Sequence, residues 1–233
     1  MPGVLAGSKV PVDPYIANVV ALLHFDGIDG GTTFTDETGK SWSQSGTATL
    51  TTTDPKFGTA SLNVPASSDI RSPNHVDFEF GSGDWTVEAW IKPTSTSDYN
   101  ILCYGTTYGL GYGLRFFVDR VSAGGALAIA CYPNLALLGV AKSGDNAVSL
   151  NVWHHVAAVR YGSNLYLYLD GNRVGSGAIA GTIGDFGYEM CAGSYLGSES
   201  LEGQEDDLRI TKGVARYTGL TYTVPSGPFQ NPP

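Results

Sequence analysis

The stretch DDLRITKGVARY, Asp206–Tyr217, alternates between two faces and then enters a short turn that ends on an aromatic residue. A similar pattern lies upstream, where WHHVAAVRY, residues 153–161, is followed across Gly162–Ser163 by an alternating strand over residues 164–169. A short apolar run, residues 19–25, precedes the turn Asp26–Gly27. Because alternation with period two places successive side chains on opposite faces of a sheet, these segments predict an antiparallel all-β protein.

The composition favours one large β-domain. The chain has 233 residues, with 31 Gly, 12 Pro and 42 % hydrophobic residues, which suits many short strands joined by tight turns. No stretch holds a helical period, so we expect almost no helix beyond a turn at residues 214–217. Besides the three segments above, the expected strands are 47–53, 60–64, 85–91, 100–105, 114–118, 126–132, 173–174 and 190–193.

Residues 1–16 differ from the rest of the chain. Three prolines interrupt this segment and its apolar residues follow no period. We expect an extended N-terminal arm over residues 1–16 and a single domain over residues 17–233. The arm is either a lead-in or a segment that docks onto a neighbouring subunit.

The net charge of −9, with no basic run, argues against nucleic-acid binding and against attachment to an anionic membrane. Cys103, Cys131 and Cys191 lie in apolar or small-residue surroundings and are expected to be buried free thiols. No signal peptide and no run of about 20 apolar residues is found. We therefore expect synthesis in a reducing cytoplasm and, for any role outside the cell, release within a particle or by lysis.

The order of the three decisive segments resembles that of the concanavalin A-like, laminin-G-like jelly roll. More narrowly, it is similar to the single-domain form often encoded in bacteriophage tail and virion-surface genes. The resemblance extends over Ala17–Phe229. It implies an antiparallel β-sandwich of jelly-roll type in which the last strand lies beside the first.

The same fold family includes glucanases, which carry a Glu-x-Asp-x-x-Glu pattern on one strand. Glu205 and Asp207 occupy the first two positions here, but Ile210 stands at the third, so the acid/base is missing. No Gly-x-Ser-x-Gly motif occurs, and the adjacent His154 and His155 face opposite ways. We expect no catalytic residues and a protein that is not an enzyme.

A calcium site is a further expectation. Laminin-G-like domains often hold calcium between the first and last strands, and the resemblance implies Asp26 and Asp206 as ligands, with Asp36 as a third candidate. Calcium prefers several oxygen ligands, which these carboxylates and nearby turn carbonyls could provide. The alternative is that Asp26 and Asp206 cap turns or pair with Arg209.

Tyrosines in glycine-rich, loop-like sequence are candidates for ligand contacts. Sugar sites need aromatic surfaces and a few orienting polar groups, although Tyr is equally favoured at protein interfaces. Trp85, Trp90 and Trp153 lie on strands and are expected in the core. The candidate ligand-binding residues are Tyr104, Tyr108, Tyr112, Tyr132 and Tyr195.

Two functions fit these observations. The first is a non-catalytic attachment module on a virion or phage tail that binds a host-surface glycan or protein. The second is an architectural capsid or tail decoration protein that docks on neighbouring subunits through residues 1–16. Either role favours a symmetric homo-oligomer, plausibly a trimer, on the virion surface.

Overall fold

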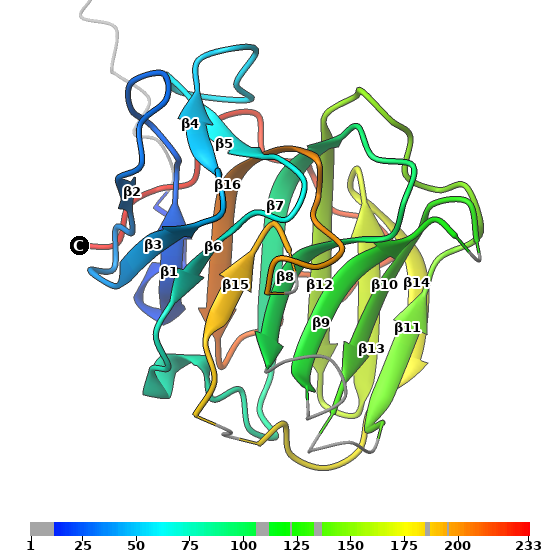
Figure 1. Ribbon diagram of the computed structural model, residues 1–233. Helices are drawn as coiled ribbons and strands as arrows, with labels where there is room; N and C mark the ends of the chain where they lie inside the picture. Colours follow the sequence, from blue (N-terminus) through cyan, green and yellow to red (C-terminus); the bar gives the residue numbers. More distant parts are fainter. Residues whose placement is uncertain (1–11, 106–111, 122, 133–136, 185–186, 195) are drawn as a thin grey trace, which may run out of the picture.

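A computed structural model describes residues 12–105, 112–121, 123–132, 137–184, 187–194 and 196–233. Two antiparallel sheets pack face to face, as Figure 1 shows. This confirms the predicted all-β sandwich. Helical structure among these residues is limited to two 3₁₀ turns, η1 (Ile16–Asn18) and η2 (Val76–Phe78). None of the described segments forms a helix long and apolar enough to span a membrane.

The first sheet lies at the back in Figure 1. Its strand order is β14 (Asn172–Ala178), β13 (Asn164–Leu169), β12 (His154–Tyr161), β7 (Trp85–Pro93), β16 (Gly203–Lys212), β5 (Ser61–Val64) and β4 (Thr49–Thr51). Strand β1 (Val19–Leu23) also pairs with β16, so the last strand does lie beside the first.

The second sheet lies in front. Its order is β11 (Gly139–Lys142), β10 (Ala126–Cys131), β9 (Tyr112–Asp119), β8 (Tyr99–Gly105), β15 (Met190–Ala192), β6 (Asp69–Ser72), β3 (Ser41–Ser45) and β2 (Phe34–Thr35). The sequence pattern missed β2, β3, β6 and β11, which are only two to five residues long. β3 and β6 pair with each other across more than 20 residues, whereas β2 and β11 pair with strands close to them in the chain.

The hydrophobic core fills the space between the sheets. Strand β7 contributes the four residues that the alternation predicted, Trp85, Val87, Ala89 and Ile91, and all are fully buried. The three cysteines are also buried and unpaired, as expected. A core of this size accounts for a fold that needs no disulfide.

Strand β16 contains a bulge at the stretch that decided the fold. Its register with β7 shifts between Asp206 and Arg209, and Asp207 has φ of 51°. One edge of β16 pairs with β5 before the bulge and with β1 after it. The extra residue lets both Glu205 and Leu208 face the core, and the outward pair Asp206–Asp207 lies in the gap between β5 and β1.

Part of the outer face of the first sheet is covered by the C-terminal segment, residues 213–231. Tyr217 and Tyr222 stack with ring centroids 3.7 Å apart and pack on Ala157, Val159 and Tyr168 of β12 and β13. Residues 214–217 form no helical turn in this cover, so the turn predicted there is wrong. The reason is that tertiary packing holds the segment flat on the sheet.

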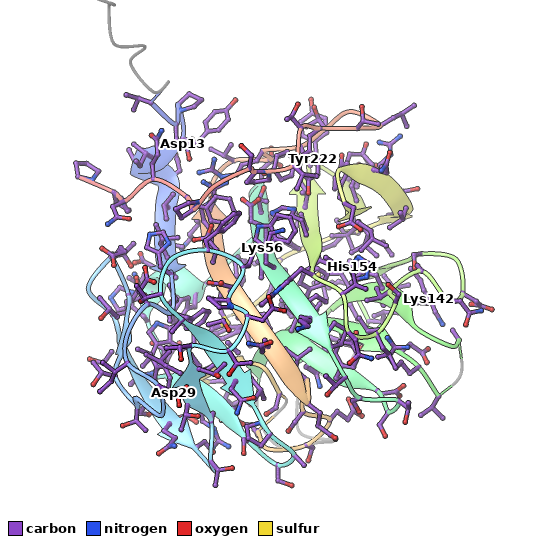
Figure 2. The ribbon with its side chains drawn as sticks, turned by 90° about the horizontal axis from the view of Figure 1, so that it is seen from above. Asp13, Asp29, Lys56, Lys142, His154 and Tyr222 are labelled. Atoms are coloured by element: carbon purple, nitrogen blue, oxygen red, sulfur yellow. The ribbon has the colours of Figure 1, made fainter. Side chains whose placement is uncertain are left out.

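The described part of the predicted arm, residues 12–16, contacts the domain. Asp13 pairs with Arg209 at 2.9 Å and with Arg216 at 2.8 Å, and both guanidinium groups are nearly buried. Figure 2 shows Asp13 on the same side as Tyr222 and the C-terminal segment. The two ends of the domain therefore meet on one face. Residues 1–11 lie outside the described part of the chain.

Candidate ligand-binding grooves

The residues that could imitate a glucanase site are not available for that chemistry. Glu205 faces the core opposite Ile91 and Leu62, and both of its oxygens lack a hydrogen-bond partner among the described residues. Burial raises the pKa of Glu205 well above its usual value, because the charged form is poorly solvated in the core. Asp207 accepts the backbone N–H of Phe229 at 2.9 Å. Neither carboxyl reaches a surface where a sugar could bind.

Glu88 lies on the outer face of the first sheet but is enclosed. Burial alone would raise the pKa of Glu88, yet Arg209 and His155 hold it below its usual value. Arg209 donates two hydrogen bonds to one oxygen, at 2.9 and 2.8 Å, and the Tyr217 hydroxyl donates to the other at 2.6 Å. Glu88 therefore fastens the C-terminal cover to the sheet.

His24 fastens the end of the same cover. Its two ring nitrogens contact Asp207 at 2.5 Å and Asn231 at 2.6 Å. Burial opposes the charged ring, but these two hydrogen bonds outweigh it and raise the pKa of His24 to about 9. Through these contacts the partly buried His24 links the first strand to the C-terminus.

The two predicted calcium ligands hold the same loop, residues 54–59. Asp26 is exposed and accepts the Thr59 N–H and hydroxyl through one oxygen. Asp206 is buried and accepts the N–H groups of Lys56 and Phe57 at 2.8 and 3.1 Å. Burial raises the pKa of Asp206 to about 7.

The described residues contain no group of three or more His, Cys, Asp or Glu side chains placed to hold a metal ion. The carboxylate of Asp36, the third candidate, accepts hydrogen bonds from the backbone N–H groups of Leu22 and Thr38 and from the indole N–H of Trp42. A calcium ion at Asp26 and Asp206 stays a prediction, and both residues already have a structural role as loop anchors.

The predicted tyrosine cluster is only partly described. Tyr104 is fully buried in the core and its hydroxyl donates to Asn74 at 3.1 Å, so it cannot serve as a sugar platform. Tyr132 is half-buried beyond the end of β10. Tyr112 begins β9, and Tyr108 and Tyr195 lie outside the described residues.

A polar groove of about 570 Å³ lies on the outer face of the first sheet, where β5 and β7 end and β16 begins. The C-terminal cover contributes none of its lining residues. Its floor carries Asn63, Lys92 and Gln204, which lie side by side because Gln204 is the cross-strand partner of both others. Its rim carries Thr51, Thr53, Asn151 and Glu202. We call this the first groove.

The amide and carboxylate groups of the first groove point to a polar ligand. Within the described part of the chain, the side chains of Asn63, Asn151 and Glu202 make no hydrogen bond, and Asn151 and Glu202 are exposed. The side-chain amide nitrogen of Gln204 donates to the Thr53 carbonyl at 2.6 Å and to the Ser61 hydroxyl at 2.9 Å, which fixes the orientation of the amide. Convergent, oriented polar groups in a concave site are what polyhydroxylated ligands require.

A second groove of about 490 Å³ lies next to the first. The two share Ala66 and Glu202 as lining residues, so these form a ridge between them. The second groove is lined by small hydroxyl side chains, including Ser97 and Ser198, and by Asp98 and Glu199. Val121, which is 77 % exposed, adds an apolar contact.

The loop that contributes Glu202 to this ridge, residues 196–202, has a strained backbone that hydrogen bonds support. Leu196, Glu199 and Glu202 have φ of 49°, 49° and 43°, a region that non-glycine residues seldom occupy. Ser67 and Asn151, which also line the grooves, share this conformation. Such strain costs about 1–3 kcal/mol per residue and gathers at functional sites.

Hydrogen bonds from three sides hold this loop in place. The carbonyl of Glu202 accepts the Thr94 N–H at 2.9 Å, and that of Glu199 accepts the Asn100 N–H at 2.9 Å. Buried Asp69 of β6 accepts the N–H of Gly197 at 2.6 Å. The loop is therefore set before any ligand arrives, which lowers the entropy cost of binding.

Comparison with known proteins agrees with the architecture. The family model described as the concanavalin A-like lectin/glucanases superfamily matches residues 63–215, more than half of the chain. The chain belongs to this superfamily. The matched part contains β12, β13 and β16, which belong to the segments that decided the fold, but not β1. No curated protein sequence matches the chain.

Solved structures with the same superfamily fold are distant in sequence. The binding domain of Paraclostridial Mosquitocidal Protein 1 has 15 % identity and a TM-score of 0.62, over 85 % of this chain and 49 % of that one. Domain 4 of an extracellular arabinanase from Geobacillus stearothermophilus, solved with arabinotriose, has 18 % identity and a TM-score of 0.62, over 85 % and 94 %. The binding domain of botulinum neurotoxin DC, in complex with SialylT, has 13 % identity and a TM-score of 0.61, over 84 % and 48 %.

The chain thus spans about half the length of the toxin binding domains and nearly all of the arabinanase domain. The two toxin structures are named as binding domains, and the arabinanase domain was solved in complex with arabinotriose. At these identities the likeness shows the fold alone.

The grooves were not found from the sequence. Their residues come from six separate segments, each of which is an ordinary polar loop or strand end in one dimension. One available signal was the non-alternating stretch SESLEG, residues 198–203, directly before the best-defined strand. Its strain became visible only in the structure.

Proposed function

We propose that this chain is a non-catalytic glycan-binding module that attaches a virion or tail to a host surface. The observation that carries the proposal is the first groove. It presents unpaired amide and carboxylate groups to solvent beside a loop whose backbone is fixed by hydrogen bonds. Polar groups that fix orientation are the part of a sugar site that confers specificity.

Two further observations support binding without catalysis. The carboxyls that match a glucanase pattern face the core or hold the C-terminal cover. The outer face at Glu88 and His155 is buried, so a long substrate has no access to it. The arabinotriose and SialylT bound by two neighbours of the same fold are consistent with a carbohydrate partner. The virion setting extends the sequence resemblance to phage tail and surface domains.

The test is a bacterial glycan array screened with the purified chain, with calcium and with chelator. Specific binding that is lost in Asn63→Ala or Glu202→Gln, but kept in Ser176→Ala on the remote strand β14, would support the proposal. Loss of binding in chelator would connect Asp26 and Asp206 to the ligand. A clean negative would overturn glycan recognition and favour the architectural role.

The architectural role needs a modified deletion experiment. Removing residues 1–16 would also remove Asp13, whose carboxylate neutralises Arg209 and Arg216. A deletion of residues 1–11 keeps this contact. Loss of particle incorporation in that shorter deletion would support docking through the arm, and unchanged incorporation would exclude it.

A further inference from the structure

We infer that the two grooves bind one ligand, an elongated and uncharged oligosaccharide chain that crosses the ridge at Glu202 and Ala66. This inference rests on the proposed glycan-binding function and gives its ligand class. The grooves are adjacent, and both are lined by the two ridge residues. Each has the volume of a complete small-ligand site, so a ligand that contacts both is long.

The charges that line the grooves exclude an anionic chain. Lys92 is paired with Asp54 at 2.6 Å, and Arg115 near the second groove is paired with Glu199. Glu202 has no cation partner among the described residues. An anionic sugar would meet an uncompensated carboxylate without a free guanidinium or ammonium group, which costs binding energy.

Glu202 suits the centre of such a site. Its side chain is exposed on the ridge, while its carbonyl is fixed by the backbone and hydroxyl of Thr94. A carboxylate accepts hydrogen bonds from sugar hydroxyls, and these charge-assisted bonds are about twice as strong as neutral ones. From the ridge it can reach hydroxyls of sugar units in either groove.

The grooves differ in character, which fits a chain with a polar edge and an apolar edge. The first groove offers amides through Asn63 and Gln204. The second offers serine hydroxyls and the exposed side chain of Val121, against which the CH face of a sugar can pack. A single sugar in one groove would leave the other set of contacts unused.

The experiment measures affinity against chain length. An array carries linear arabinan, xylan, glucan and galactan oligosaccharides from disaccharide to octasaccharide, with oligogalacturonates as charged counterparts. We expect affinity for the preferred neutral chain to rise with length and then level off, and oligogalacturonates to bind at least about tenfold more weakly. Preferential binding of oligogalacturonates, or affinity independent of length, would overturn the inference.

Variants then test the two grooves separately. Ser198→Trp fills the second groove and should lower octasaccharide affinity about tenfold while leaving disaccharide affinity unchanged. Ser176→Trp places the same side chain on an exposed position of β14 and serves as the control. Equal loss for short and long chains in Glu202→Gln and no loss in Ser198→Trp would restrict the site to one groove. If no glycan binds wild type at all, the proposed function itself fails.

Discussion

The buried carboxyl of Glu205 leads us to expect a free energy of unfolding that falls as pH rises. Its carboxyl faces the core, fully buried, and has no hydrogen-bond partner among the described residues. Burial raises its pKa well above 4.5. Since the unfolded chain ionises near that value and the folded chain does not, the contribution of Glu205 is most favourable below pH 4.5 and declines above it.

The magnitude follows from proton linkage. Each pH unit above 4.5 costs about 1.4 kcal/mol of unfolding free energy while the folded carboxyl stays protonated. The cost grows with pH until the folded carboxyl also ionises. Glu205→Met keeps an unbranched side chain of similar length and removes both the proton and the unsatisfied oxygens. We expect it to be more stable than wild type at pH 7, by an amount that shrinks as the pH falls toward 4.5.

Urea denaturation of both proteins at pH 5, 7 and 8 measures this difference. Glu205→Gln is the matched control, because it is neutral at every pH but leaves an amide without partners in the core. It should lose the pH dependence while gaining less stability than the methionine variant. A Glu205→Met variant that is no more stable than wild type, with a difference independent of pH, would show that the carboxyl is solvated or paired.

Three further predictions concern other charged groups. Asp13→Asn removes one of the two carboxylates that Arg209 and Arg216 share, the other being Glu88, so the free energy of unfolding should fall by about 2 kcal/mol in the same urea assay, and an unchanged value would mean that Glu88 and solvent compensate the two cations. His24, with its pKa raised from 6.5 to about 9, stabilises the fold below pH 6.5 and loses this contribution as pH rises through 9. His24→Gln should therefore flatten that decline by about 1 kcal/mol after solvent screening, whereas an identical pH profile would contradict the ion pair. Titration calorimetry with calcium should give heat that is lost in Asp26→Asn if the predicted site exists; no heat and no thermal shift in wild type would remove it.

The alternation of hydrophobic residues was enough to give the sandwich and most of its strands. In β7 and β12 each side chain faces the core or the outer surface as its parity required. This works because a strand buried on one face has only one register that hides its apolar residues. The burial of the cysteines followed from the same local composition.

The sites depended on contacts that no local pattern encodes. The bulge at Asp206–Asp207 turns Glu205 inward and makes Asp206 an anchor for a loop about 150 residues earlier in the chain. The two grooves combine the ends of β5, β7 and β16 with a strained loop.

The sequence by itself therefore determined which residues alternate, and so the fold class and the core. Only the tertiary structure decided which polar side chains hold segments of the chain together and which are left without a hydrogen bond on the surface. The physical reason is that a polar residue has no preferred face of its own. Its role is fixed by the partner that reaches it, as Asp13, Asp26 and Glu202 show in three different ways.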